Sequence, residues 1–213
     1  MGLVGKYFGI IGIILVAIIL AIVKVLGEDK AGGAMKRILA ARRASGVEAA
    51  RAEIDKAWKP AVRPDRPFGA RLCALALAGD RETLAREVGF IDGKLRVVCY
   101  PKTWGLLGLV LAGDPSAPQQ LADHVARCQR ELPGVMKKIK EAIRDIGVIG
   151  AALAGASSEP MRNIRAGLFP FHNEWTRALV WECCARAFER DGKLEEAKNV
   201  RGRNAVFERA KAA

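Results

Sequence analysis

The chain has little of the residues that carry most enzyme chemistry. Its 213 residues include two histidines and five cysteines, and 6% of them are aromatic. No CxxC pair, phosphate-binding loop, dinucleotide-binding glycine motif or nucleophile elbow occurs in it. An odd number of unevenly spaced cysteines is also unlike a disulfide framework. We therefore expect no cofactor and no metal, and the motifs predict no catalytic residue.

Two arrangements of metal-ligating or nucleophilic residues remain. His124 and Cys128 are four residues apart on a predicted helix, but zinc takes about four ligands, or three and a water molecule. His172 precedes Cys183 and Cys184 by about three helical turns. That distance is too long for a base to activate a thiol unless another element folds back. We interpret these residues as buried or half-buried helix side chains.

The strongest feature that is present is an apolar run near the N-terminus. Tyr7 to Val23 are 17 consecutive residues without a charge, bracketed by Lys6 and Lys24. A spanning helix needs about 20 mostly apolar residues, and flanking lysines extend to the two interfaces. A cleaved signal peptide is the alternative, but its apolar region has a length of about 7–15 residues. The sequence thus predicts a transmembrane anchor over residues 1–26. Its membrane-spanning residues include Tyr7, Phe8, Gly9, Gly12, Leu15, Ile19 and Val23.

Charge predicts the orientation of this anchor. The whole chain has a formal net charge of +12, and residues 30–66 hold ten Lys or Arg against four Asp or Glu. Because positive flanks stay on the cytoplasmic side, a cytoplasmic body is favoured. Cysteines without a disulfide pattern also suit a reducing compartment. An exported body behind a signal anchor is the alternative.

The basic residues next to the anchor predict a surface for anionic lipid headgroups. Such charges attract an anionic leaflet when they lie near it. Met35, Ile38 and Leu39 form a narrow apolar stripe that we expect to face lipid or a partner helix. A nucleic-acid partner is not favoured, because few aromatic residues interleave the basic stretches. The residues of the predicted anionic-lipid surface are Lys36, Arg37, Arg42 and Arg43.

The rest of the chain has the pattern of short helices separated by Gly, Pro and Asp. We expect basic juxtamembrane helices and a Pro-rich linker over residues 27–66, and a helical domain over residues 67–213. Short turns between amphipathic helices predict a mainly α fold, either a bundle or a short helical array. Asp92-Gly93 between two apolar stretches predicts a small β-hairpin near residues 88–99. Gly147 and Gly150 are expected to allow a neighbouring helix to approach closely.

The last 35 residues contain a spaced set of aromatic and small residues that suits two helices in contact. The set consists of Trp181, Ala185, Phe188, Gly192 and Ala197. This spacing resembles a single tetratricopeptide hairpin, without a second copy at the family's period of about 34 residues. The resemblance implies binding of a peptide or protein and no catalysis; an unrelated antiparallel helix pair is the alternative. Glu174, Glu182 and Glu189 of the same region are interpreted as exposed helix acids.

Together these features predict a single-pass membrane-anchored helical scaffold or adaptor, or an accessory structural subunit of a membrane protein assembly. Its partners would be the membrane and other protein subunits, reached through the transmembrane helix and the helical body. Gly9 and Gly12 share one face of that helix and suit close packing against another. The alternative is a membrane-tethered enzyme or regulator whose site no motif reveals.

Overall fold

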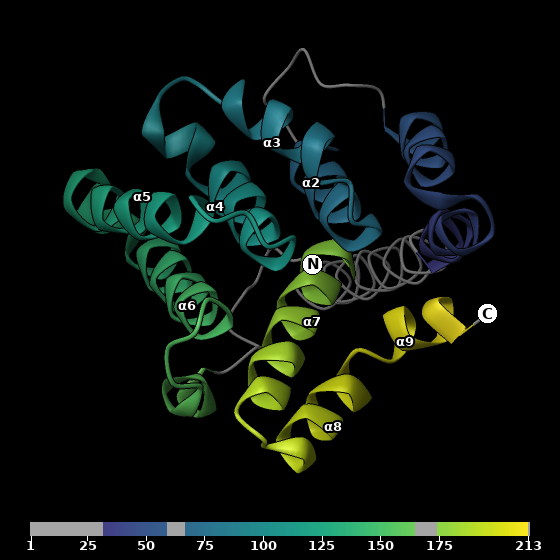
Figure 1. Cartoon of the computed structure of the whole chain (residues 1–213). Coiled ribbons are helices and arrows are strands. Elements are labelled where there is room, and N and C mark those ends of the chain that lie inside the picture. The colour runs from purple at the N-terminus through teal and green to yellow at the C-terminus, as the bar shows by residue number, and fades with distance from the viewer. Residues whose placement is uncertain (1–31, 59–66, 165–173, 213) are drawn as a thin grey trace, which may run out of the picture.

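The part of the chain that the structure describes is built from helices. The structure is a computed structural model, and it describes residues 32–58, 67–164 and 174–212 (Figure 1). Residues 32–57 are helical, with Gly46 at φ +86°, so a bend divides this segment. The mainly helical fold is confirmed. The helices that follow are α2 (Pro67–Ala78), α3 (Arg81–Gly89), α4 (Leu95–Leu111), α5 (Ala117–Glu131), α6 (Lys137–Leu153), α7 (Glu174–Arg190), α8 (Leu194–Arg203) and α9 (Ala205–Ala212), with 3₁₀ turns η1 (Gly134–Met136) and η2 (Glu159–Asn163).

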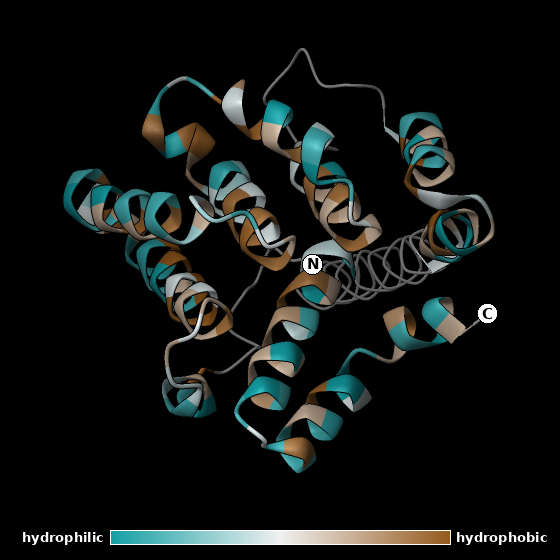
Figure 2. Cartoon of the chain, viewed as in Figure 1, coloured by the Kyte–Doolittle hydropathy of each residue, from teal (hydrophilic) through white to brown (hydrophobic). Residues whose placement is uncertain are grey.

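Four of these helices form a closed ring around the main core. α2 packs on α4, α4 on α6, α6 on α7, and α7 returns to α2. The remaining helices cover this ring: α3 lies on α2 and α4, α5 on α4 and α6, and α8 on α7. Hydrophobic residues predominate along α2 and α4, whereas hydrophilic residues predominate along α5 and α8 at the periphery (Figure 2). Because α2 and α7 are far apart in the sequence, the described body is a closed bundle and not an open array of successive neighbours.

Glycines set the closest approaches between helices. A Cβ atom at Gly150 of α6 would overlap Leu121 of α5, and one at Gly147 would lie 3.1 Å from Val125. On the other side, a Cβ atom at Gly108 of α4 would lie 2.7 Å from the Cβ atom of Ala76 in α2. The close approach predicted at Gly147 and Gly150 is therefore confirmed, and the neighbour is α5.

The predicted β-hairpin near residues 88–99 is wrong. α3 continues to Gly89, and α4 begins at Leu95 and contains Pro101. Asp92 and Gly93 do form a tight connection, in which the Asp92 carboxylate accepts from the Gly93 amide at 2.7 Å. The apolar residues after it are buried at Val98 and Cys99 and half-buried at Leu95, a spacing of three and four that belongs to a helix. Packing of this face against the bundle outweighs the strand preference of its β-branched residues.

No helix in the described ranges is long and apolar enough to cross a membrane. The predicted membrane-spanning run from Tyr7 to Val23 lies outside the described residues.

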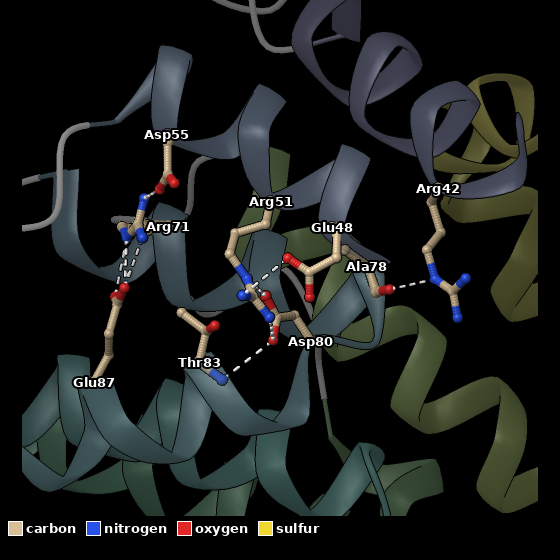
Figure 3. Close-up of polar contacts among 9 residues, drawn as sticks. All are labelled: Arg42, Glu48, Arg51, Asp55, Arg71, Ala78, Asp80, Thr83 and Glu87. Atoms are coloured by element: carbon tan, nitrogen blue, oxygen red, sulfur yellow. Dashed lines mark hydrogen bonds and ion pairs between the residues drawn. The ribbon is translucent and has the colours of Figure 1, made fainter. Parts of the chain in front are cut away.

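A buried arginine joins the 32–57 segment to the bundle. Arg71 of α2 is 2% exposed. Its guanidinium donates to both carboxylate oxygens of Glu87 in α3, and to Asp55 Oδ1 at 2.7 Å (Figure 3). It also donates to the Trp58 carbonyl at 2.8 Å. Burial alone would lower the pKa of Arg71, but the hydrogen bonds to Glu87 and Asp55 raise it above its ordinary value. We call Arg71, Asp55 and Glu87 the Arg71 cluster.

A second arginine, Arg51 of the 32–57 segment, meets the start of α3. Arg51 Nη2 donates to Asp80 Oδ1 at 2.9 Å, and that oxygen also accepts from the Thr83 amide at 3.1 Å. Asp80 is thus the N-cap of α3, as its position before a helix indicates. Burial alone would raise the pKa of Asp80, but the hydrogen bonds from Arg51 and Thr83 lower it. The Asp80 carboxylate therefore has two roles: it caps the start of α3, and it holds the 32–57 segment to the bundle.

We predict that Arg71→Met lowers the free energy of unfolding by about 3–5 kcal/mol, because the Glu87 carboxylate, whose side chain is 12% exposed, loses its hydrogen bonds from the guanidinium. For a chain of this size this is a loss of roughly 6–20 °C in Tm, measurable by circular dichroism. Arg127→Met is the matched control: it removes an ion pair with Glu131 whose side chains are 55% and 48% exposed, and such pairs contribute about 0.3–0.5 kcal/mol. Equal shifts in the two variants would contradict the role of the Arg71 cluster.

Candidate functional site

The basic residues predicted to meet lipid lie on the 32–57 segment and are exposed. Lys36, Arg37 and Arg43 extend into solvent, and Arg37 forms a long ion pair of 3.8 Å with Glu53. Arg42 differs from them, since its Nε donates to the Ala78 carbonyl at the end of α2, at 2.8 Å (Figure 3). The predicted surface therefore contains three outward-facing cations and one that also holds the segment to the bundle.

The apolar stripe of this segment faces the body of the same chain. Met35, Ile38 and Leu39 are 0%, 1% and 7% exposed, and all three belong to the main core. Of the two surroundings expected for them, the structure places them against other helices and not in lipid.

The residues that resemble a tetratricopeptide hairpin do come together. α7 and α8 pack against each other, and Gly192 turns the chain between them at φ +71°, a conformation that glycine adopts readily. Ala185 and Ala197 are buried at 0% and 1% exposure. Trp181 and Phe188 line a cavity of about 220 Å³ that is bounded by α7, α8 and the η2 region, with Arg162, Glu196 and Arg203 also in its wall.

The described residues weighed for metal binding or nucleophilic chemistry are buried. His124 Nε2 lies 3.1 Å from the Cys99 carbonyl and 3.6 Å from Cys128 Sγ. Within the described ranges no three His, Cys, Asp or Glu side chains are grouped as metal ligands would be. Burial raises the pKa of the Cys128 and Cys184 thiols to about 12, which disfavours the reactive thiolate. His172 lies outside the described residues.

Two of the acids interpreted as exposed are buried, and one of them faces a pocket. Glu174 and Glu182 of α7 are 8% and 3% exposed. α7 closes the four-helix ring and is covered by α8 and α9 on its other sides, so most of its surface meets other helices. The sequence contained a signal for this, since apolar residues surround Glu182 on every side of the helix.

Glu182 lies in the wall of a cavity of about 380 Å³. The cavity is bounded by the 32–57 segment, the C-terminal ends of α2 and α4, the middle of α7, and α9. Three cationic side chains surround it with Glu182: Arg42, Arg186 and Lys211. Its apolar wall consists of Leu39, Leu77, Leu111 and Phe207, with the small residues that end α2.

One oxygen of the Glu182 carboxylate is left without a donor. Oε1 accepts from Arg186 Nε at 2.8 Å and lies 3.9 Å from Lys211 Nζ. Oε2 is buried and has no hydrogen-bond partner among the residues that the structure describes. A buried acceptor in this state costs about 1–3 kcal/mol. The cavity therefore has an excess of positive charge, from three cations against one carboxylate, and its volume lies within the range of small-molecule sites.

Comparison of the chain with protein-family models, with curated proteins and with solved structures found no match.

The buried imidazole predicts a specific pH dependence of stability. Burial lowers the pKa of His124 below its ordinary value; the hydrogen bond with the Cys99 carbonyl opposes this shift, and repulsion from Lys102 and Arg127 adds to it. Below about pH 6.5 the unfolded chain binds a proton at this site while the folded chain stays neutral, so stability falls as the pH drops. We expect His124→Gln to reduce the loss of stability between pH 7 and pH 5, by up to about 1.4 kcal/mol per pH unit.

Urea unfolding at a series of pH values measures this loss. Cys128→Ala is the control, because it removes the neighbouring thiol and should retain the wild-type slope. An unchanged slope in His124→Gln would show that other groups dominate in this pH range.

Proposed function

We propose that this chain is a single-pass membrane-anchored helical adaptor, or an accessory structural subunit of a membrane protein assembly. The uncharged run from Tyr7 to Val23 supports the anchor, because its length and its flanking lysines match a spanning helix. The positive flank after this run supports a cytoplasmic body. Burial of all five cysteines, none of them in a disulfide, agrees with a reducing compartment.

The observation that carries this proposal is the attachment of the 32–57 segment to the bundle. This segment begins only a few residues after the apolar run, and Arg71, Arg51 and Arg42 all hold it to α2 and α3. A spanning helix would therefore keep the whole bundle close to the bilayer surface. Lys36, Arg37 and Arg43 would then lie where anionic headgroups attract them.

Exposed apolar side chains offer places for partner proteins. Phe90 is 77% exposed and Val97 is 48% exposed, and they flank the connection between α3 and α4. Val135 and Leu194 are exposed at two other connections, at 94% and 67%. Large apolar groups left in water favour association with a partner, so we propose the α3–α4 connection, which has two of them, as the docking surface.

A membrane-tethered regulator or enzyme is the second candidate function. The cavity around Glu182 favours it, because charged groups from three separate parts of the chain converge there. A regulator would couple a ligand in this cavity to a partner elsewhere on the bundle.

The anchor predicts how the protein is extracted from membranes. The full chain should stay in the pellet after carbonate extraction, and deletion of residues 1–26 should release a folded body, as judged by its helical circular dichroism. Replacing Lys36, Arg37 and Arg43 by Gln is the matched control: it should leave the full chain in the pellet and weaken only the binding of residues 27–213 to anionic vesicles. A body that stays in the pellet after the deletion would show a second membrane attachment.

The adaptor function predicts a partner chain that purifies with the protein in mild detergent. Phe90→Ser combined with Val97→Ser should deplete that chain several-fold without lowering Tm, since both side chains are exposed. Val135→Ser, at a different connection, should retain it. The adaptor proposal fails if reciprocal purification with the tagged partner does not recover this protein, or if the double variant retains the partner fully.

A further inference from the structure

The connection between α5 and α6 presents an apolar side chain to water. Val135, in the middle of η1, is 94% exposed, more than any other exposed large hydrophobic residue in the described ranges. Leu132 and Met136, close to it in the sequence, pack in a small core cluster with Cys128 and Ile143. The turn therefore has a buried base, and Val135 is the residue that it directs outward.

Hydrogen bonds hold this turn to both helices. Lys140 Nζ donates to the Leu132 carbonyl at 3.3 Å, and Gln129 Nε2 donates to the Lys140 carbonyl at 2.7 Å. These bonds join the end of α5 to the start of α6 on either side of Val135. The exposure of Val135 is thus set by the packing of the two helices.

Positive charge is concentrated around Val135. From residue 127 to residue 144 the chain has six Lys or Arg and two Glu. Two of the six form ion pairs with nearby acids. Lys137, Lys140 and Arg144 also line a cavity of about 370 Å³ beside the turn, with Glu141 as its one acid. The six cations are Arg127, Arg130, Lys137, Lys138, Lys140 and Arg144.

Two of these cations lie where the helix itself disfavours them. Lys137 and Lys138 are exposed and are the first two residues of α6, whose first turn contains no acid. The N-terminus of a helix carries partial positive charge, so cations there are unfavourable. α3, α7 and α8 have Glu in the same place. The two lysines therefore lower the stability of α6, and a partner of negative charge would reverse that effect.

The pattern favours a lipid bilayer over a protein or a nucleic acid. Lysine is depleted in protein interfaces, where aromatic residues are enriched. No aromatic residue occurs between positions 127 and 144, so there is none in this stretch on which a base could stack. A cluster of four to eight cations suits an anionic leaflet, and a bilayer surface also admits a protruding apolar side chain.

We propose that the α5–α6 connection binds an anionic phospholipid bilayer, with Val135 entering the acyl boundary and Lys137 and Lys138 next to the headgroups. α5 and α6 lie at the edge of the bundle opposite the 32–57 segment (Figure 1), so this surface is separate from the basic residues of that segment. The contact goes beyond the adaptor function, because residues of the described body form it and it requires no spanning helix.

The test places an environment-sensitive fluorophore on Val135→Cys in the full chain. Selective labelling is expected, because the five native cysteines are buried. The labelled chain is dialysed from detergent with an excess of vesicles, so that the turn can reach a bilayer whether or not the chain spans it. Replacing about a third of the phosphatidylcholine by phosphatidylserine should raise the emission roughly twofold or more and shift it to the blue, and added salt should reverse both changes.

The matched control carries the label at Leu194→Cys. Leu194 is 67% exposed at another connection and precedes Glu195 and Glu196, so its emission should stay unchanged. Lys137→Gln combined with Lys138→Gln should reduce the response at position 135 several-fold without lowering Tm. Lys198→Gln combined with Arg209→Gln removes the same charge from exposed positions of α8 and α9 and should retain the response.

The proposal is overturned if phosphatidylserine affects the label at position 135 no more than the label at position 194, or if salt leaves the response unchanged. It is also overturned if the double lysine variant responds as fully as the control pair. Poly-L-glutamate serves as a probe for the competing partner. A shift with this polymer and none with phosphatidylserine would assign the surface to an acidic protein and reject the bilayer.

Discussion

A guanidinium taken out of water must be surrounded by carboxylates and carbonyl groups, and at Arg71 these come from two other parts of the chain. Glu87 belongs to α3, Asp55 belongs to the 32–57 segment, and the Trp58 carbonyl lies directly after that segment. Removal of Glu87, which accepts from both Nε and Nη2, would leave most of the buried positive charge without compensation. The position of the 32–57 segment, and with it the first wall of the Glu182 cavity, depends on this single side chain and its neighbours at Arg51 and Arg42.

The second constraint is the central place of α7. A helix that meets neighbours on most of its surface has no side on which to keep its acids in water, so Glu182 and Glu174 are buried. Glu174 pairs with Arg177, and Glu182 with Arg186. In the Glu182 pair one buried carboxylate oxygen keeps no donor among the described residues. The cavity is thus polar because α7, the helix that closes the ring, places Glu182 and Arg186 in its wall.

Local features of the sequence predicted much of the fold. Some roles depend mainly on residues nearby in the sequence and were predictable from spacing. They are the cap at Asp80 before α3, the turn at Gly192 between α7 and α8, and the close approach at the glycines of α6. The start of α4 could not be predicted in this way, because Asp92-Gly93 suits a hairpin. Only the packing of Val98 and Cys99 against the bundle favours a helix there. The cavity could not be predicted either, since its charged residues are contributed by segments that are more than 100 residues apart, from Arg42 to Lys211. Neither the periodicity of apolar residues nor the spacing of charged residues along the sequence indicates a contact between such distant segments.

The sequence distances within the Arg71 cluster bear on the order in which the chain folds. Arg71 is 16 residues from Asp55 and 16 residues from Glu87, so these bonds close short loops at little entropic cost. α7, by contrast, reaches α2 only after about a hundred further residues have been synthesised. The N-terminal part can therefore assemble on a ribosome while the inner faces of α2 and α4 still await their cover. A chain halted before α7 would carry an intact charge cluster beside an open apolar surface, which is the kind of species that chaperones recognise.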